Sequence, residues 1–420
     1  MRLLTIPALA VVPLLLAGVP AGAAPADAPR PVRAVAETPS LFDDEAGGDA
    51  DADDPAIWVH PTDPAGSLVV ATAKNGGLRV YDLRARERQS IPTPAAPGPE
   101  EEAGRFNNVD LVRGFRLGHR AVDLAVVTDR GRDQLRFYRI DPVTRRLVDV
   151  TAPDVPYAFS SDQAEVNTQR TAYGLGTFTD RDGRVYAVVS RRSTPEVGVF
   201  RLVERAGQVT YRPVDRLTLP STFTLPDGSS WSPCTDPGDG PQVEGTVVDP
   251  ATGVVYLAQE KVGLWRTRLA GGRFAEAPVP VERVREFGIP ASYDPEEDCV
   301  TDHAADPGFG GRIAQDVEGL TIYPTGRLTG TLVVSSQGDD SFYTYDRRTN
   351  RPTGRFAVVD GRVDGAQECD GAAVVATPLP GFPGGLLVVH DGRNTPETPG
   401  RDGEARPDTN FKFLDAGFLR

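Results

Sequence analysis

The chain has 420 residues, of which 59 are acidic and 45 basic, and its formal net charge is −14 at pH 7. This negative charge argues against nucleic acid and anionic membranes as partners, so an anionic ligand would need a local group of cations or a bound metal. Length alone would suggest two or three domains, but the repeat described below indicates one.

Residues 1–24 have the pattern of a secretory signal peptide, with one early positive charge, an apolar stretch and small residues before an expected cleavage after Ala23 or Ala24. A retained membrane anchor is the alternative. Pro7 and Pro13 interrupt the apolar stretch, and no later segment approaches the ~20 apolar residues needed to cross a bilayer. We therefore expect a secreted protein without a membrane partner.

Residues 25–40 are rich in alanine, proline and charged residues, and this composition predicts a flexible leader. In residues 41–420 helical periodicity is scarce, whereas short β-branched runs bounded by Gly, Pro, Asn and Asp recur. One unit appears six times: an apolar run, a polar tip, a short turn and an alternating strand. The six runs begin at Leu68, Leu124, Val185, Val254, Leu332 and Leu386.

Six such units, each long enough for about four short strands, predict an all-β chain folded as a six-bladed β-propeller over residues 41–420. A β-sandwich of hairpins is the alternative, although sandwiches seldom repeat in this way. Equivalent positions in a propeller face one axis, so the polar tips should form a ring. Counting along the runs places in this ring Lys74, Arg130, Arg191 with the adjacent Arg192, Glu260, Gln337 and Asp391.

The strand before each run contributes a second predicted ring, in which five of six residues are carboxylates. In a partly desolvated channel each like pair costs on the order of a few kcal/mol, so a cation is expected among them. Oxygen donors without sulfur or imidazole favour Ca²⁺, and the four histidines lack the spacing of zinc ligands. A lone aspartate would otherwise be a solvated turn or a helix cap. The members are Asp54, Asp110, Tyr173, Glu244, Glu318 and Asp370.

The two rings together predict a site for a ligand with several negative charges, and phosphate groups fit both the metal side and the basic side. Several Ca²⁺ ions can activate water and bridge phosphoryl oxygens while Lys and Arg stabilise the remaining charge. Such a site needs no side-chain nucleophile.

The chain has three cysteines, Cys234, Cys299 and Cys369. In a protein that leaves the cytoplasm one disulfide is possible. Cys234 and Cys299 form the favoured pair because both lie in loop-like segments rich in Pro and Asp, and three unpaired thiols are the alternative.

Seven motifs, in order along the chain, resemble those of the β-propeller phytases of the 3-phytase type. The resemblance runs from about Gly48 to Lys412. It implies a six-bladed propeller that needs Ca²⁺ for stability and activity. It also implies stepwise removal of phosphate from myo-inositol hexakisphosphate presented as its calcium complex. The motifs are DADDPAIWVHP, RFNNVDLV, QVEGTVVD, YLAQEKVGLW, DVEGLTIY, SSQGDDSFYTYDR and VVHDGRN.

The resemblance also implies roles for individual residues. Lys74, Arg130 and the Arg191/Arg192 pair would hold the scissile phosphate, with Tyr173 beside them. The implied ligands of the catalytic calcium ions are Glu244, Glu260, Asp316, Glu318, Asp364 and Asp370. Further channel positions that would bind calcium or phosphate are Asp54, Asn107, Asp110 and Gln337, and the late motif with Asp391 and Asn394 would have a calcium or structural role.

Some positions depart from the family pattern. Gln259 stands where an acidic residue is common, and Arg191/Arg192 stand where lysine is frequent. Two long insertions, around residues 221–240 and 275–312, have no assigned counterpart.

The sequence therefore predicts a secreted, monomeric, calcium-dependent phytase. One alternative is a calcium-dependent lactonase or esterase on a six-bladed propeller, which would have no use for the basic tips. The other is a secreted, non-catalytic propeller in which calcium only stiffens the blades.

Overall fold

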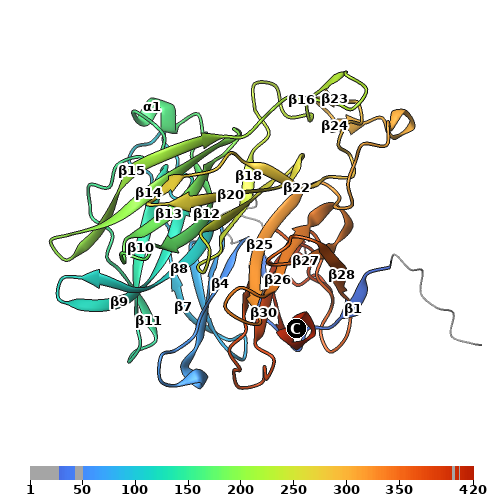
Figure 1. Cartoon of the computed structure of the whole chain (residues 1–420). Helices are drawn as coiled ribbons and strands as arrows, with labels where there is room; N and C mark the ends of the chain where they lie inside the picture. The colour runs from blue at the N-terminus through green and yellow to red at the C-terminus, as the bar shows by residue number, and fades with distance from the viewer. Residues whose placement is uncertain (1–27, 43–50, 400–402, 406) are drawn as a thin grey trace, which may run out of the picture.

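The computed structural model describes residues 28–42, 51–399, 403–405 and 407–420, so the predicted signal peptide at 1–24 lies outside the described residues. Six β-sheets are arranged around a central axis, and the described residues contain one short α-helix, α1 (Gln163–Val166) (Figure 1). The predicted all-β, six-bladed propeller is confirmed. Within the described ranges, no helix combines the length and the apolar character that a membrane span requires.

The first three blades are antiparallel meanders of four strands that follow one another along the chain. The first strand of each blade lines the axis and the fourth lies at the rim. Their bounds are β4 (Pro55–Trp58), β5 (Leu68–Thr72), β6 (Leu78–Asp82) and β7 (Glu87–Ile91); β8 (Phe106–Leu117), β9 (Arg120–Asp129), β10 (Gln134–Asp141) and β11 (Arg146–Asp149); and β12 (Ala172–Thr179), β13 (Val185–Arg191), β14 (Glu196–Arg205) and β15 (Gln208–Thr218).

The last three blades follow the same order, but two of them are completed by strands from the N-terminal segment. Blade four contains β18 (Val243–Val248), β19 (Val254–Gln259), β20 (Gly263–Ala270), β21 (Arg273–Phe274) and β22 (Val279–Arg283); blade five contains β25 (Val317–Pro324), β26 (Gly330–Ser336), β27 (Ser341–Asp346), β28 (Pro352–Val358) and β1 (Arg30–Val32); and blade six contains β29 (Ala372–Val375), β30 (Leu386–Asp391), β31 (Asp408–Asp415), β2 (Ala36–Glu37) and β3 (Leu41–Phe42).

The second strand of each blade explains the apolar runs in the sequence. A propeller sheet packs against a neighbouring sheet on each face, so its central strands are buried on both sides and read as continuous apolar runs. In β5, for example, the four residues 68–71 are at most 1 % exposed.

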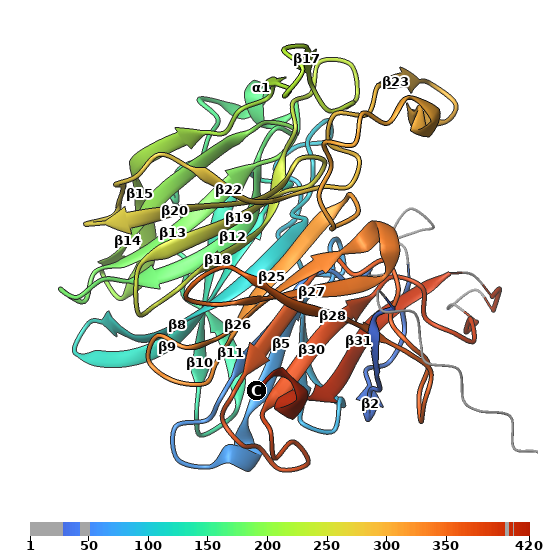
Figure 2. The same cartoon turned by 45° about the vertical axis from the view of Figure 1, so that its right-hand side comes forward.

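The N-terminal segment is part of the propeller from Arg30 onward, which corrects the expected flexible leader. β1 pairs in parallel with β28 of blade five (Figure 1), and β2 pairs antiparallel with β31 of blade six (Figure 2). Val32 and Ala34 are buried in the same core as Phe356 of β28. Two buried apolar residues within the Ala/Pro-rich stretch thus supply the contacts that hold this segment in place.

Close contacts between blades draw the inner strands together around the axis. A Cβ atom added to Gly174 would lie 1.9 Å from the Glu244 carbonyl oxygen, and one added to Gly245 would lie 2.1 Å from that of Glu318. Glycine is therefore required there because neighbouring backbones approach too closely for any side chain. Gly319 and Gly371 make the same kind of approach to Asp370 and Asp53.

The two insertions form small hairpins that project at one end of the molecule (Figures 1 and 2). They contain β16 (Phe223–Thr224) with β17 (Ser230–Trp231), and β23 (Ala291–Asp294) with β24 (Asp298–Thr301). The disulfide between Cys234 and Cys299 joins them, as the favoured pairing predicted, and Cys369 is a buried free thiol.

A buried ion pair connects blades four and five away from the axis. The Arg347 guanidinium donates to Asp249 at 2.9 Å and 2.5 Å, and both side chains are less than 5 % exposed. Burial raises the pKa of Asp249, but the Arg347 hydrogen bonds outweigh it, and the pKa lies below its ordinary value of 3.8.

We expect Asp249→Asn to lower the free energy of unfolding at pH 7 by ~3–5 kcal/mol, because it leaves Arg347 buried without a counter-charge. A depressed folded-state pKa stabilises the fold above the unfolded pKa of about 3.9, and this contribution is lost as the pH falls through the folded pKa. Urea titrations at a series of pH values should show the wild type and the variant converging in acid. Asp182→Asn is the control, because Asp182 pairs with Arg184 at the surface and surface pairs are worth about 0–1 kcal/mol. An equal loss in both variants would contradict the expectation.

Candidate functional site

Equivalent hydrogen bonds define the register of the inner ring. The backbone N–H groups of Asp54, Asn108 and Gly174 each donate to a hydroxyl on the second strand of the same blade, from Thr72, Thr128 and Ser190 respectively. The residues just before these three therefore occupy the same position in blades one, two and three. In blades four, five and six the corresponding residue is acidic and is followed by a glycine that packs closely against the next blade. The ring consists of Asp53, Asn107, Tyr173, Glu244, Glu318 and Asp370.

This register differs by one residue from the predicted ring in the first blade and by three in the second. Strand pairing is irregular between Phe106 and Val109, and the inner strands of blades three, four and five have the same irregularity beside their ring residues. A bulge re-aims the side chains of a strand. Counting residues along the sequence therefore does not give the correct ring position in these strands.

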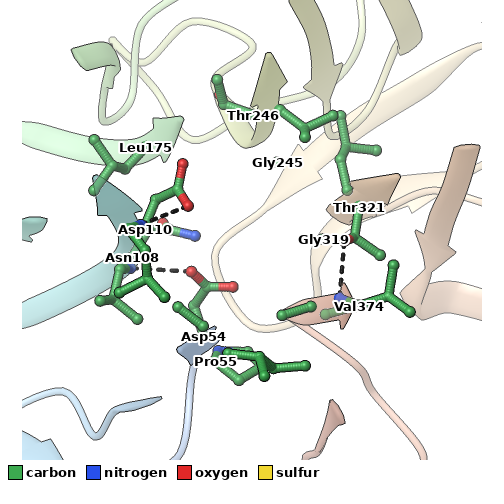
Figure 3. A pocket seen from close by; sticks show the side chains of 18 of the residues that line it. Asp54, Pro55, Asn108, Asp110, Leu175, Gly245, Thr246, Gly319, Thr321 and Val374 are labelled. Atoms are coloured by element: carbon green, nitrogen blue, oxygen red, sulfur yellow. Dashed lines mark hydrogen bonds between the residues drawn. The ribbon is translucent and has the colours of Figure 1, made fainter. Parts of the chain in front are cut away.

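Asp54 and Asp110, predicted as channel ligands, hydrogen-bond to the inner strands of the following blades. Asp54 Oδ2 accepts the Val109 N–H at 3.0 Å, and Asp110 Oδ2 accepts the N–H and hydroxyl of Thr177 at 2.7 and 2.8 Å. Both carboxylates line a hollow of about 350 Å³ along the axis (Figure 3). They thus join neighbouring blades at this level of the channel.

A cluster of three glutamates lies at the centre of the candidate site. Glu244, Glu260 and Glu318 are at most 9 % exposed, and each offers an oxygen within 4.8 Å of the others. Burial raises the pKa of all three, and repulsion within the acidic group raises it further. Three negative charges cannot remain this close in a buried site without a cation or protons.

Neighbouring side chains fix one of these glutamates from two sides. Asn107 donates its amide to Glu244 Oε1 at 2.8 Å, and the Tyr173 hydroxyl donates to Glu244 Oε2 at 2.5 Å. Burial and the adjacent glutamates hold the pKa of Tyr173 well above its ordinary value, so Tyr173 remains a donor. Glu244 is therefore held in a single orientation.

Several acidic oxygens in and beside the cluster have no hydrogen-bond partner within the described residues. They are Glu260 Oε1, Glu318 Oε2 and Oδ1 of Asp316, whose charge raises the pKa of both glutamates, and all three atoms are buried. Buried polar atoms are normally satisfied, and a hard divalent cation with oxygen ligands would satisfy these. The residues present therefore fit a calcium site, with Glu244, Glu260, Glu318 and Asp316 as its donors.

On the opposite side, Lys74 is surrounded by acidic residues. Its ammonium group lies 2.6 Å from Asp51 and 3.7 Å from Asp370. Burial opposes its charge, but Asp370, Asp53 and Asp51 together raise the pKa of Lys74 above its ordinary value. Lys74 therefore stays protonated and connects the first blade to the last.

Arg130 and Arg192 continue the basic side. Arg130 donates to Asn107 Oδ1 at 3.0 Å and lies over the Tyr173 ring, 5.8 Å from its centroid. Burial and the positive charge of Arg130 lower the pKa of Arg192, so the charges of the two guanidinium groups repel each other.

Arg192, and not Arg191, is the counterpart of Lys74 and Arg130. Each of these residues follows the hydroxyl residue of its own second strand by two positions. Arg191 instead donates to Glu165 at 2.7 Å, to Glu196 at 3.3 Å and to the Arg170 carbonyl at 2.8 Å. The structure thus separates the predicted pair of arginines.

The remaining predicted residues fall into two groups. Gln337 donates its amide to Asp370 Oδ1 at 2.7 Å, within the ring. Asp364 and Asp391 lie instead around the buried ammonium of Lys412, which also contacts Glu37 at 2.5 Å and Asp391 at 3.1 Å. The ammonium group of Lys412 thus supplies positive charge to this second acidic cluster, which consists of Glu37, Asp364 and Asp391.

Three residues of the site were not identified from the sequence. Asp53 is 1 % exposed, its Oδ2 has no partner among the described residues, and its charge interacts with Lys74, Glu244 and Asp370. Asp53 lies two positions after Asp51, which binds Lys74. Side chains two positions apart in an extended segment point to the same side, so this spacing could have indicated Asp53 as a site residue.

The other two lie beside Glu260. Gln242 donates to Glu260 Oε2 at 3.0 Å and accepts the Ser193 N–H at 2.7 Å, linking the acidic side to the segment of Arg192. Lys261 lines a small hollow with Arg192 and Glu260, and its charge lowers the pKa of Glu260 against the dominant effect of burial. No sequence pattern distinguished either residue.

Comparison with known proteins gives this arrangement a family. The model of the Phytase family matches residues 1–223 and 291–415; Glu244 and Glu260 lie in the segment between these matches. The 3-phytase of Bacillus subtilis (strain 168) is 30% identical over 379 residues, which cover 89% of this chain and 81% of that protein.

Solved structures with lower similarity include a calcium-binding protein, regucalcin, of Agrobacterium tumefaciens str. C58. It has a TM-score of 0.46 and 11% identity and covers 92% of this chain and 96% of its own. A protein from Lactobacillus plantarum has a TM-score of 0.40 and 14% identity, with coverage of 74% and 72%. The family match over most of the sequence, together with the identity to the Bacillus protein, shows that the chain belongs to the phytase family.

Proposed function

We propose that this family member is a secreted, monomeric, calcium-dependent 3-phytase. Its substrate is myo-inositol hexakisphosphate, presented as the calcium complex, and water attacks a phosphomonoester with release of phosphate. The observation that carries the proposal is the placement of the buried glutamate cluster opposite Lys74, Arg130 and Arg192.

Bound calcium would supply Lewis acidity, which activates water and polarises phosphoryl oxygens. The chain's own residues position the substrate. Arg130 and Arg192 present guanidinium groups that suit bidentate binding of phosphate, and Lys74 adds a point charge. Asn107 and Tyr173 keep Glu244 oriented while Arg130 is held against both.

The alternatives account for fewer of these features. A propeller lactonase or esterase has no need of three basic side chains at the acidic cluster, and a non-catalytic propeller needs calcium only as a brace. The family match and the mixed charge of the site both favour phosphate hydrolysis.

Removal of calcium should abolish phosphate release and destabilise the fold. A chelator leaves the glutamate cluster without its counter-charge, and the loss of a ligand held at about 100-fold its Kd costs ~2.7 kcal/mol of stability. Inorganic phosphate released from calcium phytate and the melting temperature, each measured with and without chelator, test this. Phosphate release that persists in chelator would overturn the calcium requirement, and a melting temperature that stays constant would count against the metal site.

Arg192→Ala should lower kcat/KM for phytate by about 10²–10³-fold, since removal of one donor to a transition-state oxygen typically has that effect. Arg191→Ala is the matched variant, because its side chain binds Glu165 and Glu196, and it should have a much smaller effect. Steady-state kinetics of both variants decide the assignment. A larger loss in Arg191→Ala would show that the side chains exchange roles when substrate binds.

Simple phosphomonoesters should be poor substrates. Lys74, Arg130 and Arg192 can bind several phosphate groups of one molecule at once, and a single phosphate forgoes most of that binding energy. The measurement is kcat/KM for nitrophenyl phosphate against kcat/KM for calcium phytate. Comparable values would indicate a broad phosphatase.

A further inference from the structure

A second basic hollow is lined in part by residues of β1 and β28. These two strands lie side by side in blade five (Figure 1). The volume of the hollow is about 890 Å³, within the range of about 300–1,000 Å³ typical of small-molecule sites. Four arginines from separate segments line it, together with Ser341, Asp339 and Tyr343. They are Arg30 of β1, Arg285 after β22, Arg312 before β25 and Arg355 of β28.

Three of the four guanidinium groups pair with two carboxylates. Asp339 accepts from Arg285 at 2.9 Å and lies 3.4 Å from Arg355, while Arg312 pairs with Glu282 at 2.5 Å. Arg30 donates to the Phe418 carbonyl oxygen at 3.5 Å and lies over its ring. Among the residues that line the hollow, four are arginines and one, Asp339, is acidic, so positive side chains predominate there in a chain whose formal net charge is −14.

Arg285 and Arg312 are held in place but remain partly exposed. The Tyr343 hydroxyl lies 3.4 Å from Arg285 and 3.1 Å from Arg355, and it donates to the Arg312 carbonyl oxygen at 2.8 Å. The side chains of Arg285 and Arg312 are still 48 % and 44 % exposed. Guanidinium groups fixed on one side and open on the other suit charge-assisted binding of phosphate oxygens.

The hollow is separate from the axial site but shares one turn with it. The 3-10 turn Gln337–Asp339 places Gln337 against Asp370 of the ring and Asp339 against Arg285. The ring residue Asp370 and the arginine hollow therefore contact different residues of the same turn, and no residue of the ring lines the hollow.

We propose that this arginine pocket is a second anion site that binds a small molecule carrying two or more phosphate groups. A polyphosphate matches both the predominance of positive side chains and the size of the hollow. The proposal does not depend on the reaction in the axial site.

Isothermal titration calorimetry with tripolyphosphate in calcium-free buffer tests the proposal. The background is Arg130→Ala/Arg192→Ala, which weakens the axial site, and we expect one tripolyphosphate still to bind. Adding Arg285→Gln/Arg312→Gln should lower the affinity at least about tenfold, because hydrogen bonds from charged groups are lost. Inorganic phosphate, titrated in parallel, should bind more weakly because it reaches fewer of the arginines.

The matched control is Arg184→Gln/Arg268→Gln in the same background. These arginines are 44 % and 47 % exposed, pair with surface carboxylates and lie outside the pocket. The control should leave the affinity within about twofold, since net charge alone acts weakly across screened distances. An equal loss in the control, no loss in Arg285→Gln/Arg312→Gln, or no binding in the background at millimolar tripolyphosphate would each overturn the proposal.

Melting temperatures of all variants establish that they are folded. If Arg285→Gln/Arg312→Gln is unfolded, Arg30→Gln takes its place, because Arg30 contributes its charge to the pocket through an exposed side chain. Tripolyphosphate should then bind more weakly to Arg30→Gln than to the background, and an unchanged affinity would contradict the proposal.

Discussion

The structure depends on the close approach of six inner strands around one axis. Glycines after Tyr173, Glu244, Glu318 and Asp370 let the backbone of each blade contact the ring residue of the next. The same approach that packs the blades therefore drives carboxylates into a small buried volume, where burial and mutual repulsion raise their pKa values. The close packing of the inner strands is therefore the reason that the ring needs a bound cation.

The basic residues of the site compensate only part of this negative charge. Lys74 offsets part of the negative charge of the first and last blades, whereas the charges of Arg130 and Arg192 repel each other, which favours the binding of an anion between them and the metal side. Glu260 and Glu318 keep oxygens without partners in the described part of the chain. A divalent cation would bind the unpartnered glutamate oxygens, and a phosphate group would bind the arginines. The metal and the polyanion therefore belong to one proposal.

Much of this arrangement could be predicted from the sequence, because a propeller repeats its geometry. The apolar runs located the second strands, and counting one strand back from each run located Tyr173, Glu244, Glu318 and Asp370. The prediction failed where the local backbone departs from regularity. An irregular pairing after Phe106 moved the ring from Asp110 to Asn107, and a count accurate to about one residue could not separate Arg192 from Arg191. Gln242 and Lys261 could not be predicted, because their roles depend on how the third and fourth blades pack together: Gln242 contacts Ser193, and Lys261 lines a hollow with Arg192.

The strands that the N-terminal segment adds to the last two blades have a consequence for how the molecule forms. Ala36 pairs with Phe413, and Arg30 pairs with Phe356, so the outer edges of these blades join residues from opposite ends of the polypeptide. Contacts between such distant positions are slow to form, because a long loop must close before they are made. The ring can thus shut only after nearly all of the chain has been synthesised. Until then the acidic residues of the first and last blades remain apart, and the complete cation site is among the last features to assemble.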